Sequence, residues 1–275
     1  MTAPLGHRTD LLVLISVNGA NPNGDPLNKG LPRTDRNRHG VISAVCIRRK
    51  LRDRFAEMGQ DILISPPEFP GDDLETRVSR LPETDSGFAG EACRKWYDVR
   101  AFGQVFPFMG RVLPGIKGAV SLQQAVSVSP VNICSSKVTC CLPVSGSAYR
   151  PGYVNYVEHG LYLLKGSIIP GQAVRNGFTV GDGVLLREAL LHMFDNDCST
   201  MRPAGSMEVE RLFWWEHPGM LGRYSPAEVF RSVSVEPLVK QPKSMDDYTI
   251  THTPLPGLGA AVYGEPTAVG TSRRG

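Results

Sequence analysis

The chain has 275 residues, of which 41% are hydrophobic, and carries a net charge of +3 from 30 Lys and Arg against 27 Asp and Glu. These values are typical of a globular protein of one or two domains and exclude a chain that is disordered over most of its length. No apolar run approaches the roughly 20 residues of a membrane-spanning helix, so we expect no membrane partner. The six cysteines form no CxxC pair and no zinc-type spacing with histidine. We therefore expect reduced thiols, a cytoplasmic protein, no metal and no cofactor.

Most of the positive charge lies in one window near the N-terminus. Nine basic and two acidic residues between Lys29 and Arg54 give this window +7, so the rest of the chain sums to −4. Local clustering of this kind is typical of a footprint on a phosphate backbone, although a solvated helix face produces the same pattern.

The first predicted element is a buried strand over residues 11–17, an apolar run bounded by Asp10 and Asn18. We prefer a strand to the apolar region of a signal peptide because turn residues follow the run directly. Residues 18–25 are dense in Asn, Gly and Pro, which reach left-handed backbone angles or fix turns. The strand should therefore end in a sharp loop that continues to about Gly40.

A basic amphipathic helix is predicted over residues 41–58. Ser43 is a candidate N-cap and Gly59 a candidate C-terminal cap, and apolar residues recur three and four positions apart along one stripe. The basic residues lie largely off that stripe. Arg48 and Arg52 are one turn apart and can present their guanidinium groups to the same phosphate or to adjacent ones.

Five segments are expected before the second helix. Residues 60–97 are rich in Pro and acidic residues, which indicates a loop-rich surface insertion. Residues 99–108 and 119–128 are apolar and predict two strands joined by a Gly-rich bend. Alternating residues over 129–157 are typical of a projecting hairpin, and residues 161–169 predict another strand.

The C-terminal part is predicted to contain a helix over residues 183–194 and strands over 211–216 and 229–235. Residues from about Pro254 onward are rich in Gly, Ala, Thr and Ser, which predicts a disordered tail. This order of elements predicts an α+β fold of βαββαβ type, the ferredoxin-like or RRM arrangement, which hosts many unrelated activities.

Several motifs narrow the family. In chain order they are NPNGDP (Asn21–Pro26), LPRTD (Leu31–Asp35), HGVISAVCIRRKLRD (His39–Asp53), DVRAFG (Asp98–Gly103), IKGAVSLQQAVSVSPV (Ile116–Val131), YVEHGLYLLKGSI (Tyr156–Ile168), LLREALLHMFDNDCSTMRPAGSM (Leu185–Met207) and RLFWWEHPGMLG (Arg211–Gly222). These segments resemble the Cas7 family of CRISPR-associated proteins, the backbone subunits of Cascade within the RAMP superfamily. The resemblance is strongest to subtype I-C and next to I-B, and it covers about residues 11–235.

The order of the two signatures, NPNGDP and then DVRAFG, is the specific part of this resemblance. The chain departs from the family in three places. The family usually carries an acid where Ala44 stands, and often Arg where Val126 stands and Asp where Ser129 stands. These departures bear on the subtype and on individual contacts.

The resemblance implies a hand-shaped subunit with an RRM-like palm, a finger-like insertion and a projecting thumb hairpin. The implied divisions are the first part of the palm with its basic loop and helix at 1–59, the finger-like insertion at 60–97, palm strands at 98–128, the thumb at 129–157, the remainder of the palm at 158–240 and a largely flexible tail at 241–275.

The resemblance also implies a non-catalytic role in antiviral defence. Copies of such a subunit polymerise along the spacer region of a CRISPR RNA (crRNA) and display its bases for pairing with a target DNA strand. Expected partners are the crRNA, the target strand through the guide, neighbouring copies, a handle-capping subunit, a large PAM-reading subunit, and a helicase-nuclease or other effector. Every spacer differs, so contact with phosphates and stacking on bases must be independent of sequence.

The candidate RNA-binding residues follow from this reading. Asn21 and Asn23 either bond to RNA or only shape their loop. Phe102 or Phe106 stacks on a base or packs in the core. Lys117 lies in a Gly-flanked bend and Arg202 in a loop after a helix. Candidate phosphate contacts in the basic window are Arg33, Arg36, Arg38, Arg48, Arg49, Lys50 and Arg52.

The adjacent Trp214 and Trp215 should face opposite sides of a strand, with the inner ring in the core and the outer ring at a subunit interface.

Two alternatives remain open on the sequence alone. The first is an endoribonuclease that uses His39 as a general base in a basic loop, or Asp35, which occupies the loop where RNA-cleaving relatives carry an aspartate. The second is an RRM-like protein that binds RNA as a monomer. The long hairpin favours a filament, because a monomer has no use for a projecting arm.

Overall fold

The computed structural model describes residues 3–68, 70–79, 81, 85–106, 115–138 and 152–264. Residues 107–114 lie outside the described residues, and they contain the end of the predicted strand over 99–108 and the first part of the predicted Gly-rich bend over 109–118. The tip of the predicted hairpin at 139–151 and the last residues, 265–275, also lie outside them. The described strands are β1 (Thr9–Ala20), β2 (Gly24–Asp25), β3 (Leu31–Pro32), β4 (His39–Ile42), β5 (Gly103–Gln104), β6 (Ile116–Lys117), β7 (Val120–Leu122), β8 (Ala125–Pro130), β9 (Ile133–Val138), β10 (Gly152–Ile168), β11 (Met207–Glu216), β12 (Val233–Pro237), β13 (Tyr248–His252) and β14 (Ala260–Tyr263). The described helices are η1 (Pro26–Asn28), α1 (Ala44–Glu57), α2 (Leu74–Ser79), α3 (Asp85–Lys95), α4 (Tyr97–Phe102), α5 (Pro170–Asn176), α6 (Val180–Leu191), α7 (Pro226–Arg231) and η2 (Met245–Asp247).

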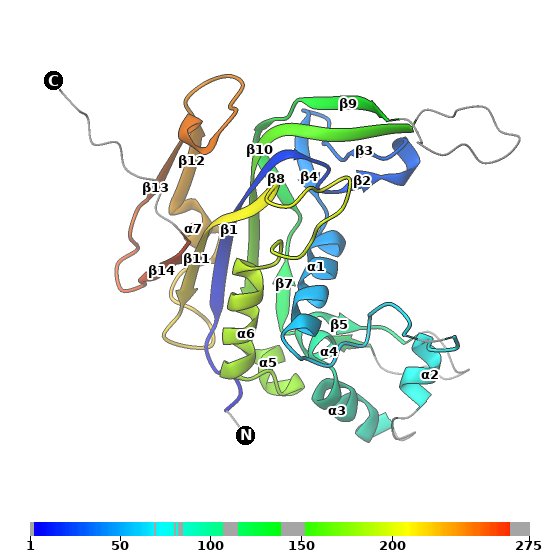
Figure 1. Ribbon diagram of the computed structural model, residues 1–275. Coiled ribbons are helices and arrows are strands. Elements are labelled where there is room, and N and C mark those ends of the chain that lie inside the picture. The colour runs from blue at the N-terminus through cyan, green and yellow to red at the C-terminus, as the bar shows by residue number, and fades with distance from the viewer. Residues whose placement is uncertain are drawn as a thin grey trace, which may run out of the picture.

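One large antiparallel sheet organises the molecule (Figure 1). In the described chain its strands run in the order β14-β11-β1-β10-β8-β4, and β7 and β9 also pair with β10. Strand β1 lies at the centre and pairs with β10 on one side and β11 on the other, over most of its length. The predicted mixture of helices and antiparallel strands is confirmed at this level.

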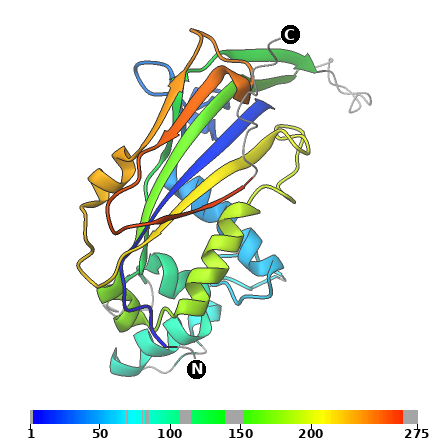
Figure 2. The ribbon, with the colours of Figure 1, turned by 90° about the vertical axis from the view of Figure 1, so that its left-hand side faces the viewer.

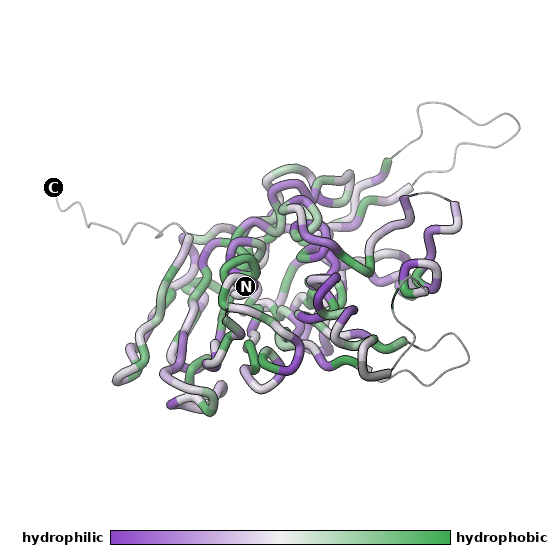
Figure 3. Tube along the Cα trace, turned by 90° about the horizontal axis from the view of Figure 1, so that it is seen from below, coloured by the Kyte–Doolittle hydropathy of each residue, from purple (hydrophilic) through white to green (hydrophobic). Residues whose placement is uncertain are grey.

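Both faces of the central strand are covered, which explains its continuous apolar run. Val13 and Ile15 pack with residues of α1 and α6, whereas Leu12 and Leu14 pack with residues of α7, β12 and β13. Each such side chain contributes roughly 1.5–3 kcal/mol on burial, so the apolar run is the strongest local determinant of the sheet. Figure 2 shows the β12–β13 hairpin on the face opposite α6. Figure 3 shows hydrophobic positions along the strands and helices and also at some of the outer turns.

Helix α1 begins two residues after the short strand β4, so the predicted helix over 41–58 started too early. Ser43 caps the helix as predicted, because its side chain accepts a hydrogen bond from the Cys46 N–H at 3.2 Å. Gly59 follows the helix with φ of +77°, a left-handed backbone angle that glycine adopts without a Cβ clash.

The predicted strand over 99–108 is wrong over most of its described length, since the chain forms helix α4 there. Val99 packs into the insertion, whereas Tyr97 and Ala101 pack under the large sheet. A helical turn sends neighbouring apolar residues to these two separate cores, and a short apolar run does not distinguish the two structures from sequence. Gly103 ends the helix where a Cβ would lie 2.3 Å from the Ile116 carbonyl oxygen.

The insertion has more structure than its composition indicated. Helices α2 and α3 enclose an apolar cluster of their own, formed by residues that include Leu63, Val78, Phe88 and Trp96. The rings of Phe88 and Phe106 meet edge to face, with centroids 5.0 Å apart. Phe106 is 2% exposed, so its ring packs in this core rather than lying free to stack on a base.

The C-terminal region differs from the prediction in two ways. The predicted strand over 229–235 begins as helix α7, where Ser225 and Glu228 form a capping box and only the following residues form β12. The predicted flexible tail contains strand β13, which pairs with β12, and strand β14, which pairs with β11. Long-range pairing therefore orders a segment that lacks a strong local pattern.

The two adjacent tryptophans face opposite sides of β11, as predicted, but both are buried. Trp214 is 3% exposed and packs on the side of α6, and Trp215 is 0% exposed and packs on the side of α7. Neither ring is available for the subunit interface expected of the outer one, because the β12–β13 hairpin covers the second face of the sheet.

Two further expectations concern membrane-spanning helices and the state of the cysteines. Among the described residues, no helix is long and apolar enough to cross a bilayer. Cys46, Cys93, Cys134 and Cys198 are free thiols, and the other two cysteines lie outside the described ranges. Burial raises the pKa of the Cys93 thiol to about 11, so it is an unreactive core side chain.

Candidate nucleic-acid interface

The NPNGDP loop is held together by its own asparagines. Asn21 is 3% exposed, and its Nδ2 donates to the Gly30 carbonyl at 2.8 Å. The Asn23 Oδ1 accepts from the Ser43 N–H at 2.9 Å, which ties the loop to the start of α1. Both side chains therefore shape the loop, as one of the two sequence readings expected. Contact of either with RNA stays a prediction.

A second turn, at residues 34–40, presents two arginines. The Asp35 Oδ1 accepts from the N–H groups of Asn37 and His39, both at 2.8 Å. The His39 Nδ1 lies 2.7 Å from the Ser127 carbonyl oxygen, to which a ring N–H donates. These bonds leave Arg36 and Arg38 exposed, and Arg38 adopts a left-handed backbone with φ of +67°. Asp35 and His39, the two residues of the endoribonuclease alternative, are thus both hydrogen-bonded to backbone groups that shape this turn.

Lys50 and Arg202 share one acidic partner. Lys50 is 6% exposed, and its ammonium is hydrogen-bonded to Asp197 and lies 5.7 Å from the Phe194 ring centroid. The Arg202 Nε donates to the same Asp197 carboxylate at 3.0 Å. These three residues tie α1 to the loop that follows α6, so a phosphate contact by Lys50 would require this pairing to break.

Arg52 is paired with a buried carboxylate. Its Nε lies 2.8 Å from the Asp98 Oδ2, and the Asp98 side chain is 1% exposed. Asp98 also accepts from the N–H groups of Leu63 at 2.8 Å and Ile64 at 3.2 Å. The aspartate of the DVRAFG signature therefore joins α1, the insertion and α4, and Arg52 serves this junction.

Two further arginines of α1 have acidic partners on the same helix. Arg49 lies 2.7 Å from Asp53, and Arg54 lies 2.9 Å from Glu57. Pairs of this kind at a helix surface contribute about 0.3–0.5 kcal/mol and exchange readily with solvent. Arg49 therefore remains accessible, unlike Arg52.

Arg48 is the one candidate of α1 for which the described residues supply no acidic partner. Its guanidinium lies 5.9 Å from the ring centroid of Phe102. Burial, and then the charge of the neighbouring Arg52, lower the pKa of Arg48. Phe102 is 9% exposed and belongs to the core, where it supports both arginines.

Two predicted residues lie at other positions. Arg33 is half-exposed and lies 3.3 Å from Asp25 within the first loop. Lys117 is exposed on β6, at the end of the molecule near α5, and its carbonyl accepts a hydrogen bond from Asn176. The structure thus brings the loops and α1 together and leaves Lys117 apart from them.

The sequence reasoning missed the acids that neutralise the basic window. Asp98 and Asp197 lie 46 residues from Arg52 and 147 residues from Lys50, respectively. No local signal marks such partners. Arg36, Arg38 and Arg48 are the candidate arginines that have no acidic partner in the described chain, and the described residues contain no cluster of metal-ligating side chains.

Known proteins resemble this chain in sequence pattern and in fold. The family model of CRISPR-associated protein Cas7 matches residues 7–253. A chain of "CRISPR RNA-guided surveillance complex, pre-nicking" has a TM-score of 0.50 at 13% identity, over 76% of this chain and 78% of that one. A chain of "CRISPR RNA-guided surveillance complex" has a TM-score of 0.47 at 15% identity, over 76% and 68%. No curated protein matches. Because the family model covers far more than half of the sequence, this chain belongs to the CRISPR-associated protein Cas7 family.

Proposed function

We propose that this chain is the non-catalytic backbone subunit of a type I CRISPR effector complex, Cascade, and that copies of it polymerise along the spacer region of a crRNA. The observation that carries the proposal is the family match over residues 7–253. The structural neighbour with a TM-score of 0.50 supports the same fold. Subtype I-C, the closest resemblance of the sequence motifs, is the subtype we propose.

The palm of the proposed subunit is the set β1, α1, β8, β10, α6 and β11. These elements follow one another in a strand-helix-strand-strand-helix-strand order, and their strands lie as β11-β1-β10-β8. Helices α1 and α6 share the apolar cluster on one face of these strands. This is the arrangement that an RRM-like palm requires.

The proposed thumb is the arm that β9 forms with the first part of β10. Six residue pairs join the two strands, from Ile133 with Val157 to Val138 with Gly152. The arm projects from the sheet in Figure 1, and Ser135, Ser136 and Lys137 along it are exposed. A polar arm that extends beyond the sheet suits contact with a neighbouring copy or with RNA.

Guide binding in this proposal is electrostatic. Arg36, Arg38 and Arg48 contribute charge that no described acid neutralises, and Arg49 contributes charge through an exposed pair. Contacts of this kind read phosphates irrespective of sequence, so the bases stay free to pair with a target DNA strand. The remaining proposed partners are neighbouring copies, the handle-capping and PAM-reading subunits and the recruited effector, all within the cytoplasm.

The test is co-expression with a CRISPR array and the other complex genes, followed by purification without nuclease. The bound nucleic acid is extracted and sized, and the intact complex is weighed by native mass spectrometry. We expect RNA of uniform spacer length with several copies of this chain, dissociating as salt rises. A nucleic-acid-free monomer, or one protein copy per RNA, would contradict the filament.

A further inference from the structure

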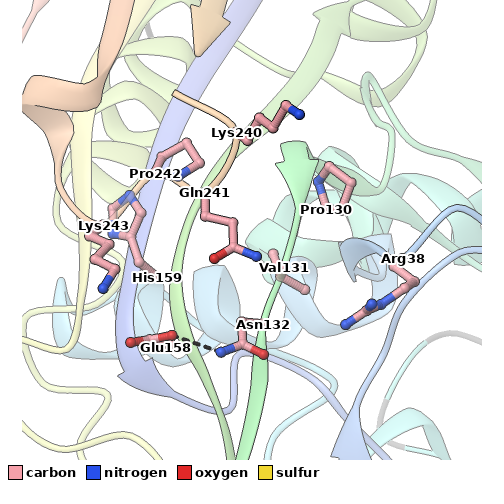
Figure 4. Close-up of a pocket in the computed structure, with 10 residues that line it drawn as sticks. All are labelled: Arg38, Pro130, Val131, Asn132, Glu158, His159, Lys240, Gln241, Pro242 and Lys243. Atoms are coloured by element: carbon pink, nitrogen blue, oxygen red, sulfur yellow. Dashed lines mark hydrogen bonds between the residues drawn. The ribbon is translucent and has the colours of Figure 1, made fainter. Parts of the chain in front are cut away.

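A pocket lies on the face of the sheet opposite α1, where the loop between β12 and β13 approaches β10 (Figure 4). Its cavity of about 140 Å³ is roomy, because a single water needs only about 10–15 Å³. Arg38, Lys240 and Lys243 line the pocket together with the side chains of Gln241 and Asn132. In Figure 4, Arg38 approaches from the right and Lys243 from the left, and Gln241 and Asn132 lie between them.

The three cationic side chains are free to bind a ligand. Arg38, Lys240 and Lys243 are exposed and have no side-chain hydrogen bond or ion pair within the described residues. The only acid of the lining, Glu158, accepts a hydrogen bond from Asn132 at 2.8 Å. The pocket therefore has an excess of two positive charges.

A nearby acid, Asp247, accepts hydrogen bonds from backbone groups and forms no ion pair with Lys243 among the described residues. The Asp247 Oδ2 accepts from the N–H groups of Lys243 at 2.7 Å and Ser244 at 3.2 Å, which sets the shape of the loop. The loop is also tied to the hairpin by the bond from the Leu238 N–H to the Asp247 carbonyl at 2.8 Å. The lysines are thus carried on a loop with a defined backbone.

The base of the pocket contains an unsatisfied polar group. His159 is 6% exposed, its Nδ1 lies 2.5 Å from the Asn18 Oδ1, and its Nε2 is buried with no hydrogen-bond partner. Burial lowers the pKa of His159, so the ring is neutral at pH 7 and the charge of the pocket comes from the Arg and Lys residues. Because Nδ1 donates to the Asn18 oxygen, Nε2 of the neutral ring is a hydrogen-bond acceptor, so it accepts from a donor such as water and makes no bond to an anion.

We propose that this pocket binds one phosphate group of a nucleic-acid strand, held by Arg38, Lys240 and Lys243. This second contact lies on the opposite face of the sheet from Arg48, and the inference rests on the proposed function for the origin of the strand. Arginine forks and lysine ammonium groups both suit phosphate oxygens, and a site that touches no base is independent of sequence. The strand is either the guide RNA or a DNA strand, and separate binding arms distinguish the two.

The experiment compares the double variant Lys240→Gln/Lys243→Gln with the control Arg223→Gln/Arg231→Gln, which removes the same charge from exposed positions outside the pocket. Fluorescence anisotropy measures the binding of single-stranded RNA and of single-stranded DNA at several salt concentrations. We expect the pocket variant to bind more weakly by about 5- to 10-fold, and its slope of log K against log salt to fall by about 0.7 for the lost phosphate. An effect in the RNA arm identifies the guide, and an effect in the DNA arm identifies a DNA strand. Equal binding by the two double variants in both arms would overturn the proposal.

A second measurement keeps the pocket testable if the guide-backbone function fails. Pyrophosphate at millimolar concentration should raise the melting temperature of the wild type and of the control variant, but not that of Lys240→Gln/Lys243→Gln. Equal stabilisation of all three proteins would reject the pocket. Wild-type protein that binds no RNA, but is stabilised by pyrophosphate through these lysines, would reject only the guide-backbone function.

Discussion

Two basic regions that adjoin in sequence differ in whether their side-chain charges are paired with acids. In α1, Lys50 and Arg52 are bonded to acids from distant segments and are nearly buried. In the turn at residues 34–40, Arg36 and Arg38 are exposed and unpaired, because the backbone and side-chain bonds of Asp35 hold the turn without them. Equal charge density along the chain therefore corresponds to structural bonds in one region and to free binding groups in the other.

The largest expected effect concerns the buried pair of α1. Replacing Asp98 by Ala leaves the guanidinium of Arg52 and two backbone N–H groups without their acceptor. We expect a loss of about 3–5 kcal/mol in the free energy of unfolding, measured by urea denaturation. Arg49→Gln is the control, because its pair with Asp53 is half-exposed and should cost at most about 1 kcal/mol. Equal losses for both variants would remove the contrast between the buried and the exposed pairs.

The next effect concerns the unpaired arginines. Arg36→Gln/Arg48→Gln should weaken guide RNA binding on the order of ten-fold and lower the salt slope by about 1.4, since two phosphate contacts are lost. The free energy of unfolding should change little. The matched control is Arg54→Gln/Arg94→Gln, which removes the same charge from paired positions that are not candidate RNA contacts. If the control weakens binding as much, total charge decides affinity and pairing does not.

A smaller effect is expected from pH. Burial lowers the pKa values of His217 and His252 as well as that of His159. The unfolded chain therefore takes up these protons more readily than the folded chain, so stability is full above pH 6.5 and falls as pH drops below it. The melting temperature should be lower at pH 5.5 than at pH 7.5 by roughly 2–4 °C.

His252→Phe tests the origin of this pH effect, because His252 packs against the rings of Phe213 and Trp215. The variant should lose part of the pH dependence and keep its stability at pH 7.5. An unchanged pH profile would show that His252 titrates alike in the folded and unfolded chains.

The smallest effect is expected at Asp35. Asp35→Asn keeps the Oδ1 acceptor for the N–H groups of Asn37 and His39, so guide affinity should change less than about two-fold. Incubation of labelled RNA with the wild type, with and without Mg²⁺, should yield no shortened product. Cleavage by the wild type that is lost in Asp35→Asn or His39→Gln would instead support the endoribonuclease.

The local patterns of the chain predicted those elements whose stabilising contacts are also local or repeat along one face. The Ser43 cap and the apolar stripe of α1 are of this kind, and so are the apolar runs of β1 and β11. Helix α4 was missed because its apolar residues pack in two cores, and β14 was missed because its contacts are long-range, namely pairing with β11 and the bond from Arg187 to the Tyr263 hydroxyl. A short window of sequence shows neither which of two cores a residue packs in nor which distant strand it pairs with.

The sequence by itself determined the family, through the order of the NPNGDP and DVRAFG signatures, and the position of the basic window. It also determined the loop chemistry, because Asn, Gly and Asp set turns through bonds to nearby backbone groups. Only the tertiary structure decided which cations are free, since Asp98 and Asp197 reach α1 from distant segments. It also brought Lys240 and Lys243 beside Arg38, about 200 residues away along the chain. Side-chain charge is a property of the sequence, whereas the pairing of that charge depends on distances that exist only once the chain has folded.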